Sequence, residues 1–239
     1  MAENLFGHHI STQFNEELEE LRSRVLTMGG VVEQQIGDAV KALVEGDSAL
    51  AETVVNRDIE INTLEVAIDE ECTQILARRQ PTAGDLRLIV AVIKTITDLE
   101  RIGDQAEKVA RMGLSLIEME RPKNRYMEIE QLGEHVRQMF HHTLDAFARL
   151  DPEAAFKVTC EDTRIDNEYD GVMRQMMTYM MEDPRSISRS LNVIWAVRAL
   201  ERIGDHSKNI CEYIIYLVRG RDVRHLNQEQ MEQAALQGR

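Results

Sequence analysis

One six-residue segment occurs twice without change, and this repeat constrains the fold more than any other feature of the sequence. LERIGD at residues 99–104 recurs at residues 200–205. Upstream of the two copies, D-x-x-I at 58–61 corresponds to D-x-x-I at 162–165. Because a repeat at a long fixed separation marks a duplicated structural unit, we predict that each half of the 239-residue chain repeats one unit.

The units are expected to be helical. Apolar residues recur at spacings of three and four in both halves, as they do on one face of a helix. The expected helices of the two halves span residues 15–45, 48–78, 82–120, 128–150, 152–181 and 186–219. Long helices with short breaks favour antiparallel bundles. The predicted fold is all-α, with two tandem antiparallel three-helix bundles related by internal duplication. The bundles are expected at residues 15–121 and 125–220. An N-terminal segment, 1–14, precedes them, and a polar tail, 221–239, follows them, and whether this tail is ordered stays open.

Several helix starts carry capping signals. Asp47, or the serine after it, is placed to cap the second helix, and Asp151 before Pro152 is a cap followed by proline at the first helical position. Thr82 followed by Asp85 resembles a capping box with Asp in place of Glu. These signals support the predicted boundaries independently of the apolar spacing.

Composition narrows the classes of function. A formal net charge of -14 opposes binding to nucleic acid. The N-terminus lacks the basic and apolar pattern of a signal peptide, and no run of about 18 apolar residues occurs. We therefore expect a cytoplasmic protein that contacts membranes only through partners. Cys72, Cys160 and Cys211 lack disulfide or zinc spacing and are expected to be ordinary thiols.

The repeat carries paired carboxylates. Glu100 with Asp104, and Glu201 with Asp205, lie four residues apart, so the members of each pair share a helical face about 5–6 Å apart at Cβ. About 100° per residue turns Glu201 and Asp205 away from the apolar stripe of their helix. We therefore expect these acids on the outer surface of the bundle.

The preceding helix of each half carries further acids, beginning at Asp58 and at Asp162. Adjacent helices are thus expected to present two acidic pairs to one external groove, whose oxygens suit hard cations such as Mg²⁺, Mn²⁺ or iron. Gly103 and Gly204 each cost a helix about 1 kcal/mol, which indicates a packing or site role. The predicted metal ligands are Glu100, Asp104, Glu201, Asp205, Asp58, Asp162 and Asp166. The alternative is a solvated acidic face without metal.

Other candidates carry weaker signals. His206 follows Asp205 and is a possible additional ligand, although the first copy has Gln105 there. The pairs His8-His9 and His141-His142 are weaker candidates, since adjacent helical residues point about 100° apart. Methionines between residues 173 and 181 are expected to fill core gaps, with a flexible partner surface as the alternative. Trp195 is expected to pack in the core.

Enzymatic motifs are missing. The sequence has no Walker-type loop, no G-x-S-x-G elbow and no H-E-x-x-H pair. A metal-dependent carboxylate enzyme of the di-iron type needs Glu-x-x-His ligands inside a four-helix core, and no such motif accompanies the acids here. It remains an alternative to a regulatory protein, as does a purely structural dimerisation scaffold.

Two copies of E-R-I-G-D, each preceded by D-x-x-x-(N/D), make the chain resemble the PhoU family over most of its length. The segments HHISTQFNEELEELRSRVLTMG and RRQPTAGDLR extend the resemblance. It implies surface clusters of Mg, Mn, Fe or Zn, with fewer or weaker metals in the first half, where Asn62 replaces an acid. It further implies a homodimer that is not an enzyme and that represses the phosphate-starvation response, linking the ATPase subunit of a phosphate ABC transporter to a sensor histidine kinase.

Overall fold

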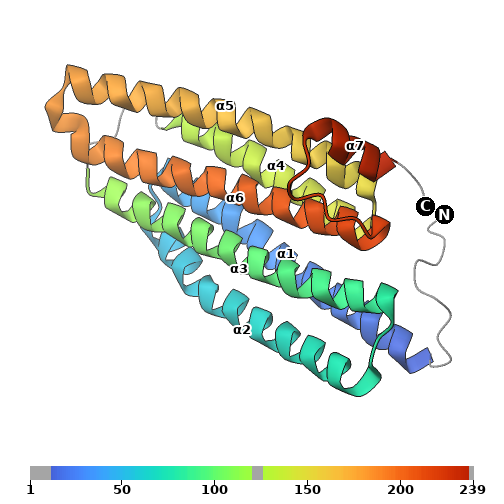
Figure 1. Cartoon of the computed structure of the whole chain (residues 1–239). Helices are drawn as coiled ribbons and strands as arrows, with labels where there is room; N and C mark the ends of the chain where they lie inside the picture. Colours follow the sequence, from blue (N-terminus) through green and yellow to red (C-terminus); the bar gives the residue numbers. More distant parts are fainter. Residues whose placement is uncertain (1–11, 120–125, 237–239) are drawn as a thin grey trace.

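The computed structural model describes residues 12–119 and 126–236, and the helices lie in the order of Figure 1. The first half contains α1 (Thr12–Glu45), α2 (Ser48–Arg79) and α3 (Ala83–Ile117). The second contains α4 (Met127–Arg149), α5 (Pro152–Glu182), a 3-10 turn (Pro184–Ser186) and α6 (Ile187–Arg219), and α7 (Gln228–Leu236) follows. Each of the six long helices begins and ends within three residues of the predicted bounds. The predicted all-α fold of tandem three-helix bundles is confirmed.

Capping at the helix starts follows the sequence in two of three cases. The Asp47 carboxylate accepts a hydrogen bond from the Leu50 N–H at 3.0 Å, and Asp151 accepts from two backbone N–H groups at the start of α5. At the start of α3 the predicted capping box is wrong. The Thr82 hydroxyl donates to the Asp85 side chain at 3.2 Å and makes no cap bond to the backbone.

The two halves share one core. Buried apolar side chains from α1 to α7 form a single continuous cluster, in which α3 of the first half and α6 of the second share the most extensive contact of any described helix pair. α1 packs against α4, and here glycines allow close approach: a Cβ built on Gly133 would lie 2.6 Å from a methyl of Val40. Figure 1 shows α3 and α6 side by side along the middle of the molecule. The acidic repeat segments on these helices therefore flank the junction of the halves.

The end of the chain is partly folded. α7 packs on α5 and α6 and buries Met231, Ala234 and Ala235. The Arg219 guanidinium donates to the Ala235 carbonyl at 2.6 Å and 3.0 Å, which fastens this short helix to the end of α6. Residues 228–236 of the polar tail are therefore ordered as a helix.

Two further expectations from the sequence concerned the cysteines and membrane-spanning helices. The three cysteines are free, Cys72 and Cys211 are buried, and burial raises the pKa of both buried thiols to about 12. No helix in the described part of the chain combines the length and the apolar character needed to cross a membrane.

Candidate metal sites on the paired helices

α2 and α3 bring the acids of the first half together. The first acidic cluster comprises Asp58, Asn62 and Glu65 of α2 and Glu100, Asp104 and Glu107 of α3. Burial and the charges of Asp104, Glu65 and Asp58 raise the pKa of Glu100, and burial, Asp104 and Glu107 raise the pKa of Asp58. Mutual effects of this kind require the carboxylates to lie within electrostatic reach of one another. The carboxylates of α2 and α3 in this cluster therefore lie within electrostatic reach of one another.

Two buried oxygens of this cluster have no partner. The Asn62 amide donates to Asp58 Oδ2 at 2.9 Å, which orients both side chains. Asp58 Oδ1 and Asn62 Oδ1 are buried and accept no hydrogen bond in the described structure. An unpartnered buried acceptor is costly in free energy, and a cation or a proton relieves that cost. The amide at position 62 thus still offers an oxygen ligand, although it lacks a charge.

α5 and α6 repeat the arrangement. The second acidic cluster comprises Asp162 and Asp166 of α5 and Glu201 and Asp205 of α6. Burial, then Asp162 and Asp205, raise the pKa of Asp166. Burial and the Asp205 charge raise the pKa of Glu201, whose Oε2 is buried without a partner.

The depth of the second cluster differs from the sequence-based expectation. Asp162 and Glu201 are 5% and 9% exposed, so the prediction that the acids of α6 lie on the outer surface is wrong for Glu201. Asp205 is half-buried. A helical-wheel argument measures direction from the core stripe of one helix, whereas α5 covers the flank of α6 that carries Glu201.

The repeated glycines explain how closely the helices approach. A Cβ on Gly204 would lie 3.3 Å from Ile165 Cδ1 and 3.5 Å from Asp162 Oδ1, while a Cβ on Gly103 would lie 3.1 Å from Ile61 Cδ1. Ile61 and Ile165 occupy equivalent positions in the repeat. The glycines therefore have the packing role that the sequence indicated, and this packing sets the acids of one helix against those of the next.

The clusters differ in charge at one equivalent position. Glu107 of the first repeat corresponds to Lys208 of the second, counted from LERIGD. Lys208 Nζ donates to Asp162 Oδ2 at 2.7 Å. The first cluster therefore holds the carboxylate of Glu107 where the second holds an ammonium group. This additional negative charge offsets the negative charge that the first cluster lacks at Asn62.

The donor set fits a hard cation. Both clusters offer carboxylate or amide oxygens, and three of these oxygens are buried without a partner. Within residues 12–119 and 126–236, however, no three His, Cys, Asp or Glu side chains already surround a common point. Binding of an ion would therefore require rotation of these side chains.

His206 does not join the second cluster. Its Nδ1 lies 2.7 Å from Asp98 Oδ1 of α3, and both side chains are buried. The Asn209 amide donates to the same oxygen at 3.3 Å. The interpretation of His206 as a metal ligand is therefore corrected: it links α6 to α3 across the junction of the halves. Asp98 was not among the residues predicted from the sequence. An acid among the apolar residues that precede Leu99 is nevertheless a signal of a buried polar contact.

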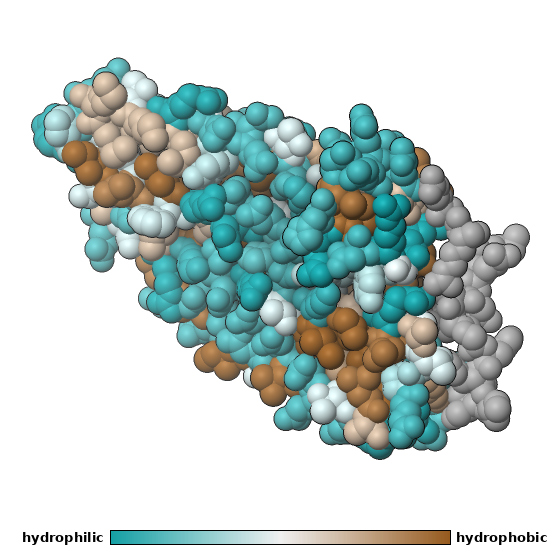
Figure 2. Space-filling model, viewed as in Figure 1, coloured by the Kyte–Doolittle hydropathy of each residue, from teal (hydrophilic) through white to brown (hydrophobic). Residues whose placement is uncertain are grey.

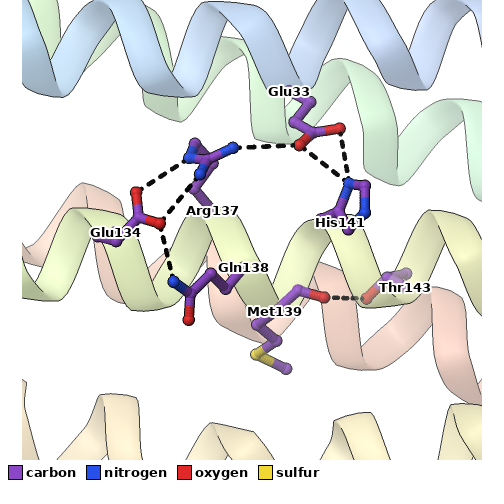
Figure 3. A network of polar contacts seen from close by, with 7 residues as sticks. All are labelled: Glu33, Glu134, Arg137, Gln138, Met139, His141 and Thr143. Carbon is purple, nitrogen blue, oxygen red and sulfur yellow. Dashed lines mark hydrogen bonds and ion pairs between the residues drawn. The ribbon is translucent and has the colours of Figure 1, made fainter.

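His141 and His142 pair with different helices. Figure 3 shows Arg137 and His141 of α4 directed toward Glu33 of α1, with His141 Nδ1 3.1 Å from Glu33 Oε1. His142 Nδ1 lies 3.0 Å from Glu161 Oε1 of α5. The two rings thus point apart, as expected, and do not form a joint site. His8 and His9 lie outside the described residues.

Two apolar expectations need correction. Met176 is buried, but Met177 and Met181 are 51% and 85% exposed, so the methionines only partly fill the core. Trp195 is 62% exposed, and the prediction that it packs in the core is wrong. In the described part of the chain, the Trp195 side chain of α6 thus lies largely open to solvent.

Comparison with known proteins shows to which family the chain belongs. A family profile described as the PhoU domain matches residues 25–112 and 129–214, one match for each half. The chain belongs to the PhoU family. A relative from Pseudomonas putida, named phosphate-specific transport system accessory protein PhoU homolog, is 56% identical over 97% of this chain and 90% of its own length. The family consists of accessory and regulatory proteins, so the enzymatic alternative is set aside.

Further similarities cover nearly the whole chain. The Escherichia coli K12 protein named phosphate-specific transport system accessory protein PhoU is 49% identical over 94% of this chain and 92% of its own. The crystal structure of PhoU from Pseudomonas aeruginosa superimposes with a TM-score of 0.84 at 54% identity, covering 87% of this chain and all of that chain. A phosphate transport system regulatory protein PhoU from Streptococcus pneumoniae gives 0.82 at 30% identity, over 88% and 99%.

Proposed function

We propose that this chain is an accessory regulator of phosphate-specific transport that represses the phosphate-starvation response when phosphate is plentiful. The observation that carries the proposal is the match to the PhoU domain in both halves, together with relatives that are named as accessory proteins of phosphate-specific transport. In this role the chain links the ATPase subunit of a phosphate ABC transporter to a sensor histidine kinase. Its three free cysteines suit the reducing cytoplasm.

The acidic clusters are proposed as the metal sites of this regulator. Glu100, Asp104 and Asp58, with the Asn62 oxygen, would hold a cation in the first half, and Glu201, Asp205, Asp162 and Asp166 would hold one in the second. A bound cation would neutralise carboxylates that burial and mutual repulsion now destabilise. The unpartnered oxygens of Asp58, Asn62 and Glu201 support this assignment. Homodimerisation is part of the proposal and has no assigned surface.

A deletion strain tests the regulatory role. Grown in abundant phosphate, it should express a phosphate-starvation reporter at the level of starved cells, and the wild-type gene should restore repression. Normal repression in the deletion strain would reject the proposed function. A gene encoding Glu100→Ala/Asp104→Ala/Glu201→Ala/Asp205→Ala should fail to restore repression at equal protein abundance, whereas Glu16→Ala/Glu20→Ala, an exposed acidic pair with the same spacing on α1, should succeed.

A further inference from the structure

One group of exposed apolar side chains lies where α5 passes into α6. Six of the eleven exposed large hydrophobic residues described lie between residues 177 and 195, and Ile187, Leu191 and Trp195 follow one another at helical spacing on α6. Figure 2 shows apolar surface at the end of the molecule where α5 passes into α6. Scattered exposed apolar residues are ordinary, but a contiguous group of this kind marks a binding surface.

A cavity adjoins this region between α3 and α6. It has a volume of about 600 Å³ and opens on the junction of the two halves. We call it the Trp195 groove and define it by Lys108, Met112, Asn192, Trp195, Arg198 and Arg202. Met112 and Trp195 supply apolar walls, so the groove offers a recess for an apolar side chain.

The charge of the groove is opposite to that of the chain. Three lining residues are cationic and none of the lining residues is acidic, although the whole chain carries a net charge of -14. Arg198 is held in place by the Glu201 carboxylate and by the Tyr169 ring, 5.7 Å from its guanidinium carbon. Across the described residues, Lys108 and Arg202 have neither a hydrogen bond nor an ion pair with another side chain, and both are exposed. These two cations remain available to an external anion.

We propose that the Trp195 groove binds an acidic segment of a partner protein, which places an apolar side chain against Met112 and Trp195. Carboxylates of that segment would pair with Lys108, Arg198 and Arg202. Aromatic and arginine side chains in a desolvated recess are typical of the residues that dominate binding energy. An amphipathic acidic helix lying along the α3–α6 seam satisfies both the apolar and the cationic requirement.

Two other occupants fit less well. A second copy placed symmetrically on this surface would set the same three cations against one another, which disfavours that pairing. A lipid bilayer is flat, whereas the cations and Trp195 line a recess between two helices. The proposal concerns a different surface from the acidic clusters and does not require that they bind metal.

The single tryptophan makes the groove directly observable. The probe is an 18-residue amphipathic peptide with leucines on one helical face and glutamates elsewhere, free of tryptophan and tyrosine. Titration into the full-length protein should shift Trp195 emission to the blue and saturate. Lys108→Glu/Arg202→Glu should weaken binding at least tenfold, while Lys157→Glu, a charge reversal at an exposed site on α5, should leave it unchanged. The same peptide with glutamine in place of glutamate should give no shift.

Several results would overturn the proposal. One is that the peptide causes no saturable shift of Trp195 emission. Another is that the peptide binds Lys108→Glu/Arg202→Glu and the Lys157→Glu control with equal affinity. A third is that only vesicles of anionic phosphatidylglycerol shift the emission. Trp195→Ala, monitored by anisotropy of a labelled peptide, should also weaken binding about tenfold. If Trp195→Ala instead lowers the oligomer mass in sedimentation, a second copy occupies the groove and the proposal is wrong.

Discussion

Arg198 Nη1 donates to Glu201 Oε1 across 2.7 Å, so a guanidinium of the Trp195 groove is bound to a carboxylate of the second acidic cluster. The other carboxylate oxygen, Glu201 Oε2, is buried and unpartnered. A cation bound at Glu201 Oε2 would weaken the attraction between the Glu201 carboxylate and the Arg198 guanidinium. The two surfaces are therefore expected to influence one another through this single pair.

Metal loading should strengthen binding of the acidic peptide. A cation at Glu201 leaves Arg198 freer to pair with the peptide, and we expect about a fivefold gain in affinity, at the low end of typical coupling between sites. Peptide titrations with saturating Mn²⁺ and with chelator measure the effect. In Arg198→Gln the affinity should not respond to Mn²⁺. A response of equal size in that variant would contradict the coupling.

Glu100→Gln should stabilise the metal-free protein at neutral pH. Burial and neighbouring carboxylates raise the pKa of Glu100 above its ordinary value of 4.5. The ionised group therefore destabilises the folded state above the raised pKa, and this penalty vanishes well below 4.5, where both states bind the proton. With chelator at pH 7.5 the free energy of unfolding should rise by less than about 1 kcal/mol, because solvent screens a half-exposed group.

Denaturant titrations across pH test this prediction. The gain from Glu100→Gln should shrink as the pH falls through the raised pKa toward 4. Glu52→Gln, at an exposed position of α2, is the control and should show no such trend. A gain that is as large at pH 4 as at pH 7.5 would show that the charge of Glu100 is not its cause.

Lys208→Ala should tighten metal binding in the second cluster. Removal of the ammonium group frees Asp162 Oδ2, to which it now donates at 2.7 Å. Calorimetric titration with Mn²⁺ should show an affinity gain on the order of tenfold, which corresponds to about 1.4 kcal/mol. Lys157→Ala should behave as the wild type. Weaker binding in Lys208→Ala would mean that the lysine supports the site instead of competing for it.

Replacement of glycine by alanine should stabilise the protein at Gly30 and destabilise it at Gly133. Gly30 has open space where a Cβ would lie, so Gly30→Ala should raise the free energy of unfolding by about 1 kcal/mol through helix propensity. A Cβ on Gly133 would lie 2.6 Å and 2.7 Å from the two methyls of Val40, and Gly133→Ala should cost about 1–3 kcal/mol through overpacking. Chemical denaturation of both variants measures the difference. Stabilisation by Gly133→Ala would contradict the described packing of α1 on α4.

Much of the fold follows from local signals in the sequence. Apolar spacing fixed the six long helices, and Asp47 and Asp151 cap the helices as predicted. The repeat also placed the acids of neighbouring helices together. Each of these inferences needs only one helix, or two helices joined by a short turn.

Features that depend on how the two halves pack could not be predicted from patterns within single helices. His206 meets Asp98 across more than a hundred residues, and periodicity within one helix carries no information on that partner. Trp195 lies in an apolar stretch of α6, but its side chain is largely exposed in the described structure. Glu201 is buried because α5 closes over it, which a single-helix projection does not include.

Metal analysis of chains purified without chelator tests most directly whether both acidic clusters bind metal. Glu100→Ala/Asp104→Ala and Glu201→Ala/Asp205→Ala should each lower the metal content per chain, and together they should abolish it. Glu16→Ala/Glu20→Ala, the exposed pair on α1, should retain the wild-type content. Unchanged metal content in both cluster variants would show that these carboxylates do not bind the metal.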